Sequence, residues 1–167
     1  MHTGRPERLT AFGYLGVHRY LLTFCTFDRR PLFTTAERVE VVRTQILRAS
    51  SDESMAIIAD CYMPDHIHLL VEGQALTSDC RRFISRAKQL SGFHFQQQFR
   101  ERLWQRYGHE RVLRGEEGTL SAVRYIFENP VRAGLVAKVT DYPFTGSSLY
   151  TVEQILDAIQ LKRWKSG

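Results

Sequence analysis

Two histidines are the residues of this sequence best suited to bind a metal ion. His66 and His68 stand two residues apart in the segment HIHLLVE. Residues at this spacing on a β-strand project from the same face, so both imidazoles are presented to one point. Neutral imidazole is a good ligand for divalent metals, which predicts a metal site here. The alternative is a half-buried strand on which two histidines fall by chance, because an isolated pair of this kind is a weak signal.

A second pair of polar residues, Tyr125 and Asn129, lies four residues apart in a segment of helical pattern. This spacing puts both side chains on one face of a helix, where the amide oxygen can complete a metal site. The alternative for Tyr125 is an ordinary core aromatic, because Ile126 and Phe127 follow it directly. The motifs GxxxxGK, GxGxxG, GxSxG and HExxH are absent, which argues against nucleotide hydrolysis, dinucleotide chemistry, serine hydrolases and zincin proteases.

Hydrophobic periodicity predicts the elements that must position these residues. Strands are expected where branched and aromatic residues cluster between turn residues, at 17–27, 55–62, 66–72 and 111–113. The second and third strands flank a tight turn at 63–65 and form a hairpin. Helices are expected where apolar residues recur every three or four positions, from Thr34 or Thr35 to about 50, over 76–90, over 116–129 and over 152–161.

The helix that carries Tyr125 is expected to stop near Asn129, because Pro130 disfavours helical geometry in the residue before it. Strands interrupted by helices, with a hairpin in the middle, predict an α+β fold. Its expected form is a ferredoxin-like antiparallel β-sheet with helices packed on it. The length of 167 residues predicts a single domain that spans residues 1–167.

The charged residues favour a phosphate-bearing partner. The chain has 23 Lys and Arg against 18 Asp and Glu, and its net charge is +5 at pH 7. Lysine is rare among the basic residues, so nearly all of them are arginine. A guanidinium group binds phosphate through two hydrogen bonds and can stack on a base, whereas an ammonium acts as a point charge. The alternative is a solvated surface that happens to be rich in arginine.

The cysteines and the hydropathy pattern indicate the cellular compartment of the protein. Cys25, Cys61 and Cys80 are odd in number and widely spaced, which argues against disulfides and cysteine zinc sites and favours a reducing compartment. No apolar stretch approaches the roughly 20 residues that span a bilayer, and residues 1–9 lack the apolar segment of a signal peptide. We therefore expect a cytoplasmic protein that is neither exported nor embedded in a membrane.

Two motifs carry a resemblance to a known family. The stretch MPDHIHLLV, residues 63–71, resembles the histidine-hydrophobic-histidine motif of the HUH single-tyrosine transposases. The stretch YIFENPVRAGLV, residues 125–136, resembles the second signature of the REP-associated tyrosine transposase branch. A looser likeness covers 104–105, 112–114 and 141–144. The family more often has Asn at Asp65 and often His at Arg111, so Asp65 adds a negative charge beside the metal and no family role is transferred to Arg111.

The resemblance implies both a fold and a reaction. The fold is the HUH endonuclease form of the ferredoxin-like sheet, and the cofactor is Mg²⁺ or Mn²⁺ bound by His66, His68 and, by position, Asn129. Tyr125 is implied to attack the scissile phosphate of single-stranded DNA, which forms a 5′-phosphotyrosine and frees a 3′-hydroxyl that can reverse the step. Family members recognise imperfect hairpins of repeated extragenic palindromes (REPs), so hairpin-bearing single-stranded DNA is the implied partner. A monomer is favoured, with a homodimer as the alternative.

Candidate DNA contacts are basic residues of the 76–90 helix and the segment after it, together with an aromatic residue for base stacking. They are Arg81, Arg82, Arg86, Lys88, Arg100, Arg102 and Arg106, with Trp104 or Tyr107 for stacking. The alternative is a solvated helix face. Three other functions stay open: a domesticated enzyme that processes repeats, a hairpin-binding module without catalysis, and a metal-dependent hydrolase of small substrates.

Overall fold

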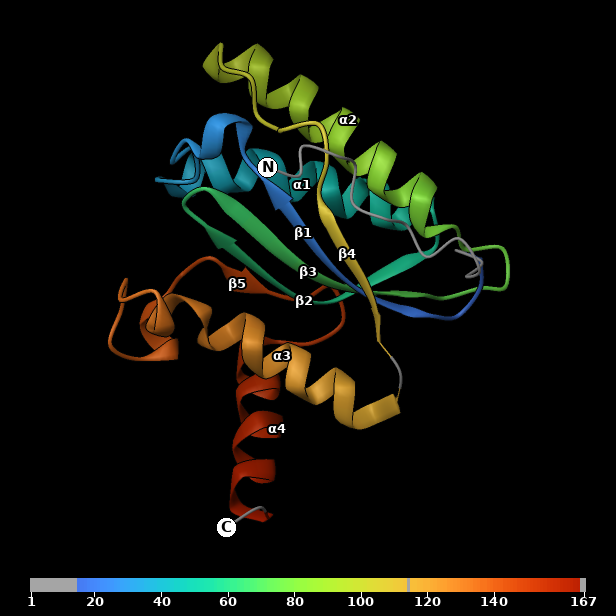
Figure 1. Ribbon diagram of the computed structural model, residues 1–167, viewed down its shortest axis with the longest axis vertical. Coiled ribbons are helices and arrows are strands. Elements are labelled where there is room, and N and C mark those ends of the chain that lie inside the picture. Colours follow the sequence, from blue (N-terminus) through green and yellow to red (C-terminus); the bar gives the residue numbers. More distant parts are fainter. Residues whose placement is uncertain (1–14, 114, 166–167) are drawn as a thin grey trace, which may run out of the picture.

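A five-stranded antiparallel sheet organises the part of the chain described by the computed structural model, residues 15–113 and 115–165 (Figure 1). The strands stand in the order β4-β1-β3-β2-β5. Their bounds are Arg19–Cys25 for β1, Met55–Met63 for β2, His66–Gly73 for β3, His109–Leu113 for β4 and Thr145–Gly146 for β5. The first four strands have the order of a ferredoxin-like sheet, and β5 extends the edge beyond β2. The predicted α+β fold is confirmed.

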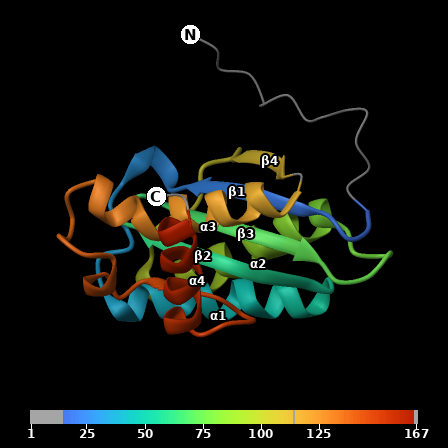
Figure 2. The ribbon, with the colours of Figure 1, turned by 90° about the horizontal axis from the view of Figure 1, so that it is seen from below.

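Helices cover both faces of the sheet, with α1 and α2 on one face and α3 and α4 on the other (Figures 1 and 2). Their bounds are Ala36–Asp52 for α1, Cys80–Phe99 for α2, Gly115–Arg132 for α3 and Val152–Lys165 for α4, with short 3-10 helices η1 at Phe27–Arg29 and η2 at Val139–Asp141. None of the described helices is long and apolar enough to cross a membrane.

Strand β3 divides its side chains between the two layers. Ile67, Leu69 and Val71 belong to the buried cluster beneath α1 and α2, whereas Leu70 belongs to the cluster beneath α3. Because side chains alternate along a strand, the even-numbered residues of β3, the two histidines included, face α3. β3 pairs with β1 on one side and with β2 on the other, so the histidines come from a rigid central strand.

Several predicted boundaries are confirmed. β2 and β3 form the predicted hairpin and pair as far as Met63 opposite His66. Thr35 is the N-cap of α1, and its side chain accepts a hydrogen bond from the backbone N–H of Arg38 at 3.3 Å. The short strand predicted at 111–113 exists and begins earlier, at residue 109. The side chain of Arg111 lies outside the described part of the structure.

Helix α2 begins later than its apolar stripe predicts. Leu76 was expected to open the stripe, but it lies before the helix and is 84% exposed. Asp79 is the N-cap, and its carboxylate accepts hydrogen bonds from the backbone N–H groups of Arg81 at 2.9 Å and Arg82 at 3.2 Å. A side chain that satisfies these N–H groups fixes the first turn, so the cap overrides the periodicity.

The prediction that the helix of Tyr125 stops near Asn129 is wrong, because α3 continues through Pro130 to Arg132. The Leu135 N–H donates to the Pro130 carbonyl at 2.9 Å, and the Gly134 N–H donates to the Val131 carbonyl at 3.0 Å. This pair of bonds is a Schellman cap, with Gly134 in the left-handed region at φ 75°. The glycine therefore sets the end of the helix, and the turn after Tyr125 is helical.

Replacing Gly134 with Ala is expected to lower the free energy of unfolding by about 1–2 kcal/mol, because a Cβ disfavours a positive φ. Equilibrium urea denaturation measures the loss. Gly118→Ala is the matched control, since Gly118 lies within α3 and an added Cβ there meets nothing within 4 Å. This control should be neutral or stabilising. Equal losses in both variants would contradict the assignment of the cap.

Candidate metal and nucleophile site

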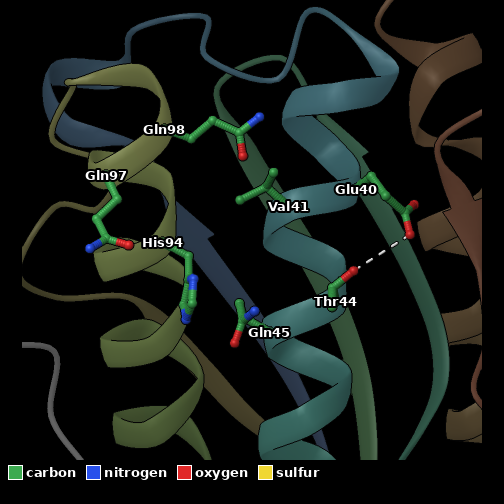
Figure 3. A pocket seen from close by; sticks show the side chains of 7 residues that line it. All are labelled: Glu40, Val41, Thr44, Gln45, His94, Gln97 and Gln98. Carbon is green, nitrogen blue, oxygen red and sulfur yellow. Dashed lines mark hydrogen bonds between the residues drawn. The ribbon is translucent and has the colours of Figure 1, made fainter.

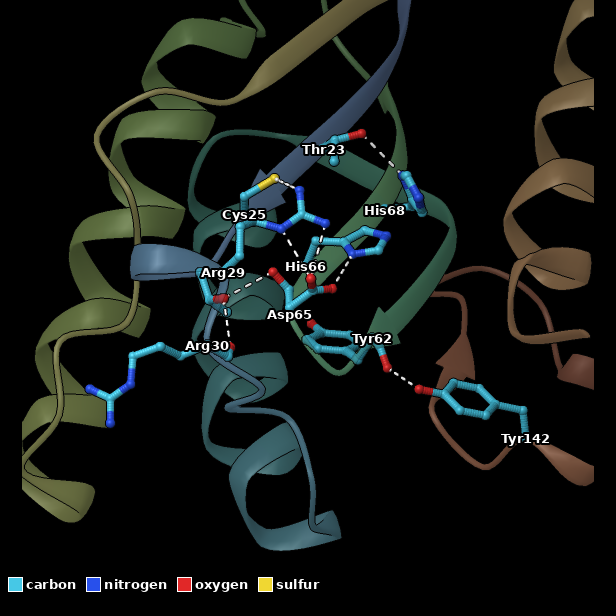
Figure 4. Close-up of polar contacts among 10 residues, drawn as sticks. Thr23, Cys25, Arg29, Arg30, Tyr62, Asp65, His66, His68 and Tyr142 are labelled. Atoms are coloured by element: carbon cyan, nitrogen blue, oxygen red, sulfur yellow. Dashed lines mark hydrogen bonds and ion pairs between the residues drawn. The ribbon is translucent and has the colours of Figure 1, made fainter. Parts of the chain in front are cut away.

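The two histidines of β3 lie side by side on the face that α3 covers. Their ring centroids are 4.8 Å apart, and the rings are nearly perpendicular. His68 is buried, with 6% of its surface exposed, and His66 is partly buried. The predicted presentation of both imidazoles to one side of the strand is confirmed (Figure 4).

Each imidazole has one ring nitrogen engaged by a neighbouring side chain. Nδ1 of His66 lies 2.7 Å from Oδ1 of Asp65, and Nδ1 of His68 lies 3.0 Å from Oγ1 of Thr23 on β1 (Figure 4). When these Nδ1 atoms carry the proton and donate it, the lone pair of each Nε2 is available to a metal ion. The two histidines are thus oriented as a pair of nitrogen ligands.

Asp65 orients His66 rather than serving as a ligand itself. Its Oδ1 accepts from His66, and its Oδ2 lies 3.0 Å from both Nε and an NH2 nitrogen of Arg29. Burial raises the pKa of Asp65, but the hydrogen bonds from His66 and Arg29 lower it more, so it lies below the ordinary value. Asp65 is therefore a carboxylate with both oxygens occupied. Arg29 reaches it from a left-handed backbone conformation, φ 53°, and also donates to Cys25 Sγ at 3.2 Å.

His68 is held in the neutral form that binds metals. Burial, followed by the positive charge of His66 and of two arginines, Arg132 and Arg29, lowers the pKa of His68 from 6.5 to about 4. The imidazole is therefore uncharged at neutral pH and has no proton to lose before it coordinates a metal.

The lowered pKa of His68 predicts that the free energy of unfolding of the metal-free protein, measured in EDTA, decreases in acid. Between pH 6.5 and about 4 the unfolded chain protonates this histidine while the folded chain does not. Stability is therefore fully present above 6.5 and falls with pH, by about 2–3 kcal/mol at pH 4.5. Urea denaturation at pH 7 and 4.5 should show a smaller loss for His68→Gln than for the wild type. Equal losses would mean that His68 is not the responsible group.

Tyr125 lies next to this pair and is open to solvent. Its ring centroid is 5.4 Å from that of His68, and the residue is 46% exposed. The alternative of a core aromatic is therefore excluded for Tyr125; its neighbours Ile126 and Phe127 are fully buried against the sheet instead. A phenol at this position can meet a large substrate beside the histidine pair.

A metal ion held by the two imidazoles would need a third protein ligand, and among the described residues no His, Cys, Asp or Glu completes a group of three. Asn129 lies on α3 one turn after Tyr125 and is partly buried. An amide oxygen beside two imidazoles, with the substrate phosphate and water, fits a divalent ion such as Mg²⁺ or Mn²⁺.

A family model for IS200-like transposases matches residues 16–126. The chain belongs to the IS200-like transposase family. The matched range contains both histidines and Tyr125 and ends before Asn129 and Arg132.

Individual relatives of this transposase agree with the family match. A Haemophilus influenzae protein named as a REP-associated tyrosine transposase is 25% identical over 146 residues, spanning 75% of this chain and 77% of that protein. The REP-associated tyrosine transposase of Escherichia coli K12 is 27% identical over 117 residues, spanning 70% and 68%. The resemblance predicted from the two motifs is confirmed.

Two solved structures share the fold of this transposase. A REP-associated tyrosine transposase bound to a REP hairpin has a TM-score of 0.70 at 23% identity, covering 83% of this chain and 81% of that one. A Deinococcus radiodurans protein described as a transposase has a TM-score of 0.51 at 20% identity, covering 73% and 97%. The HUH fold predicted from the resemblance is that of these neighbours.

The basic face of α2 does not reach the histidine pair. α2 packs with α1 on the opposite side of the sheet, and two of its predicted DNA contacts form ion pairs there. Arg82 Nε lies 3.4 Å from Glu53, and Arg86 lies 2.7 Å from Asp52. Arg81 is exposed on the same helix, and Lys88 Nζ lies 5.0 Å from the centre of the Phe24 ring. The sheet lies between these four residues and Tyr125, so any contact they make with DNA phosphates would be on the face opposite the histidines, and their predicted role in DNA binding stays a prediction.

Trp104 is not available for base stacking as predicted. It is 7% exposed and packs against Phe24 and Phe33, with ring centroids 5.7 Å and 5.8 Å away. Its Nε1 donates to Ser91 Oγ at 2.9 Å. The indole is a core group that fastens the segment after α2, whereas Tyr107 is 37% exposed and can meet a base.

The segment after α2 runs along the histidine end of the sheet. The Gln105 N–H bonds the Cys25 carbonyl at 3.1 Å, and Cys25 is the register partner of His66. Arg102 stacks on Phe27, with Cζ 4.2 Å from the ring centre, and Arg106 stacks on Tyr107 at 5.4 Å. Arg102 and Arg106 thus belong to the segment that borders this end of the sheet.

A hollow between α1 and α2 has no comparable chemistry. Its volume is about 470 Å³, and it is lined by Glu40, Val41, Thr44, Gln45, His94, Gln97 and Gln98 (Figure 3). Most of these side chains are uncharged amides and hydroxyls, and none of them comes from β3 or α3. It offers one imidazole and one carboxylate rather than a paired ligand set.

Three residues that contribute to the site have no role in the sequence prediction: Thr23, Arg29 and Arg132. Thr23 and Arg29 contact the histidine motif only through tertiary pairing, so no local pattern marks them. Arg132 lies seven positions after Tyr125, which is two helical turns, and this spacing is a usable signal once the helix is known to pass Pro130.

Proposed function

We propose that this protein is a metal-dependent transesterase that cleaves and rejoins hairpin-bearing single-stranded DNA, with Tyr125 as the nucleophile. The observation that carries the proposal is the exposed phenol of Tyr125 beside His68, whose ring centroid is 5.4 Å away, and the orientation of both histidines for coordination. A nucleophile next to a pair of oriented metal ligands is the minimal apparatus for phosphoryl transfer.

His66 and His68 would hold Mg²⁺ or Mn²⁺ through their Nε2 atoms, and Asn129 would add its amide oxygen. Bound there, the ion would polarise the scissile phosphate and stabilise charge on the departing oxygen. Thr23 and Asp65 support this arrangement because their contacts fix the orientation of each imidazole.

In the proposed reaction the phenolic oxygen of Tyr125 forms a bond to the phosphorus of the scissile phosphate. The bond between that phosphorus and the 3′-oxygen breaks. The phenol loses its proton and the 3′-oxygen gains one, so the step transfers one proton in net from Tyr125 to the new 3′-hydroxyl. The fragment on the 3′ side of the break becomes joined to Tyr125 through its 5′-phosphate, as a phosphotyrosine diester. The diester conserves the energy of the broken bond, so the 3′-hydroxyl can reverse the step without an external energy source.

The proposed substrate is a REP-like hairpin with a flanking single strand. The structural neighbour bound to a REP hairpin supports this choice. Arg102 and Arg106 would contact DNA phosphates and Tyr107 would stack on a base, since they border the histidine end of the sheet. We place the enzyme in the cytoplasm with chromosomal DNA and expect it to act as a monomer with one domain.

The test uses a labelled single strand that carries a hairpin from the flanks of the gene, incubated with the protein and Mg²⁺, Mn²⁺ or EDTA. A denaturing gel is expected to show a covalent band with either metal and none with EDTA, and mass spectrometry should place the nucleotide on Tyr125. DNA retarded on a native gel without any covalent band, across several flanking hairpins, would instead favour a binding module without catalysis.

A further inference from the structure

Arg132 is the last residue of α3 and contacts the proposed nucleophile directly. Its Cζ lies 4.4 Å from the centre of the Tyr125 ring, a cation–π distance, and it donates a hydrogen bond to the Tyr125 carbonyl oxygen. Its NH1 lies 3.8 Å from a carboxylate oxygen of Glu128. These contacts hold the guanidinium group over the exposed face of the tyrosine.

The Tyr125 ring that this guanidinium contacts also packs against His68, with ring centroids 5.4 Å apart. Burial and the charge of His66 are the larger causes that lower the pKa of His68, and the charge of Arg132 adds to them. Arg132 and His68 therefore contact the same tyrosine ring, and the charge of Arg132 acts on the buried imidazole. A phosphate bonded to the phenolic oxygen and facing the histidines would come within its reach.

The contacts of Arg132 leave hydrogen-bond donors available to a ligand. Among the described residues its guanidinium makes one hydrogen bond, through NH2 to Tyr125, and the approach to Glu128 is too long for a second. The side chain is 42% exposed. A guanidinium carries five N–H donors in a planar fork that matches the oxygens of a phosphate.

We propose that Arg132 is a catalytic residue that binds the non-bridging oxygens of the scissile phosphate and of the phosphotyrosine diester formed from it. This inference rests on the proposed function. Negative charge accumulates on those oxygens as the Tyr125 oxygen attacks, and a positioned guanidinium stabilises it without reorganising. Because both residues belong to α3, the nucleophile and the phosphate-binding group stand two turns apart on one helix and in contact with each other.

The decisive experiment is a binding cycle that needs no catalysis. Hairpin DNA with its natural scissile phosphate, or with a neutral methylphosphonate there, is titrated in EDTA into Tyr125→Phe and into the double variant Tyr125→Phe/Arg132→Gln. The neutral linkage is expected to weaken binding to Tyr125→Phe by about tenfold and to leave the double variant nearly unchanged. Equal weakening of both proteins would overturn the role of Arg132.

Rates of adduct formation provide the second readout. At saturating DNA and metal, Arg132→Gln is expected to slow single-turnover formation of the covalent band about 100-fold, and Arg132→Lys should slow it less because it keeps the charge without the fork. Arg124→Gln is the matched control, because Arg124 lies on α3 but donates to the Ile159 carbonyl at 3.0 Å, away from Tyr125. Wild-type rates in Arg132→Gln and Arg132→Lys would refute the inference.

The two proposals fail in different ways. If the wild type forms no adduct with any flanking hairpin, the proposed function fails. If the wild type forms the adduct and both Arg132 variants match it in rate and in the binding cycle, only the role of Arg132 fails. Thermal denaturation of each variant identifies any that has lost the fold. If Arg132→Gln does not fold, the rate of adduct formation in Arg132→Lys is compared with that of the wild type instead.

Discussion

The Tyr125→Phe variant is expected to form no covalent band with hairpin DNA under conditions in which the wild type does. The substitution removes only the phenolic oxygen, which is the proposed attacking atom. The ring is retained, so its packing against His68 and Arg132 is preserved. Because the residue is 46% exposed, the free energy of unfolding should change by no more than about 0.5 kcal/mol. A denaturing gel with labelled DNA and Mn²⁺ measures the adduct, and a native gel measures binding.

Tyr107→Phe is the matched control for this result. Tyr107 is also exposed, but it stacks with Arg106 on the segment after α2 rather than on α3. Its variant should keep the covalent band, with at most a weaker affinity for DNA. An adduct that persists in Tyr125→Phe and disappears in Tyr107→Phe would move the nucleophile to the other tyrosine.

Local pattern was sufficient to predict the architecture. Strict alternation in β3 and helical spacing in α1 are set by residues close in sequence, and the hairpin at 63–65 joins two strands without a crossover. Two of the errors occur where a cap competes with the pattern, and two others are the extension of α2 to Phe99 and the short strand β5. Asp79 starts α2 after Leu76, and Gly134 ends α3 after Pro130. Such caps depend on a few hydrogen bonds that hydrophobic periodicity does not record.

The site was only partly predictable, for a different reason. His66, His68 and Tyr125 belong to local motifs, and a strand face and a helix face bring them together. Arg29 bonds Asp65 across 36 positions of sequence, and Thr23 meets His68 through strand register. The position of the α2 arginines relative to the histidines was not predictable, because amphipathic spacing shows which side of a helix is polar, but not which face of the sheet that helix covers. The predicted base-stacking role of Trp104 is wrong because the sequence does not distinguish an exposed indole from a buried one that donates a hydrogen bond to Ser91.

Loss of either histidine is expected to abolish specific metal binding and, with it, formation of the adduct. In His66→Ala or His68→Ala one of two oriented imidazoles is missing, and the described residues hold no cluster of three or more His, Cys, Asp or Glu that could replace the pair. Affinity for Mn²⁺ should fall by more than the roughly 10- to 100-fold that follows when only a hydrogen-bond partner of a ligand is changed. Electron paramagnetic resonance of free Mn²⁺ measures this affinity without DNA or turnover, so it separates the metal site from catalysis.

Thr23→Val and Asp65→Asn give the graded comparison that makes this expectation specific. Thr23→Val removes the hydrogen-bond partner of His68 Nδ1, and Asp65→Asn removes the charge beside His66 and restores the residue more often found in the resembling family. Each should weaken Mn²⁺ binding by about tenfold while keeping both ligands. The affinity for Mn²⁺ should therefore be highest in the wild type, lower in Thr23→Val and Asp65→Asn, and lowest in the two histidine variants. This order is expected if β3 supplies the ligands and its neighbours only orient them. Unchanged Mn²⁺ affinity in His68→Ala would place the metal elsewhere, and the histidine pair would then be a buried polar contact between β3 and β1.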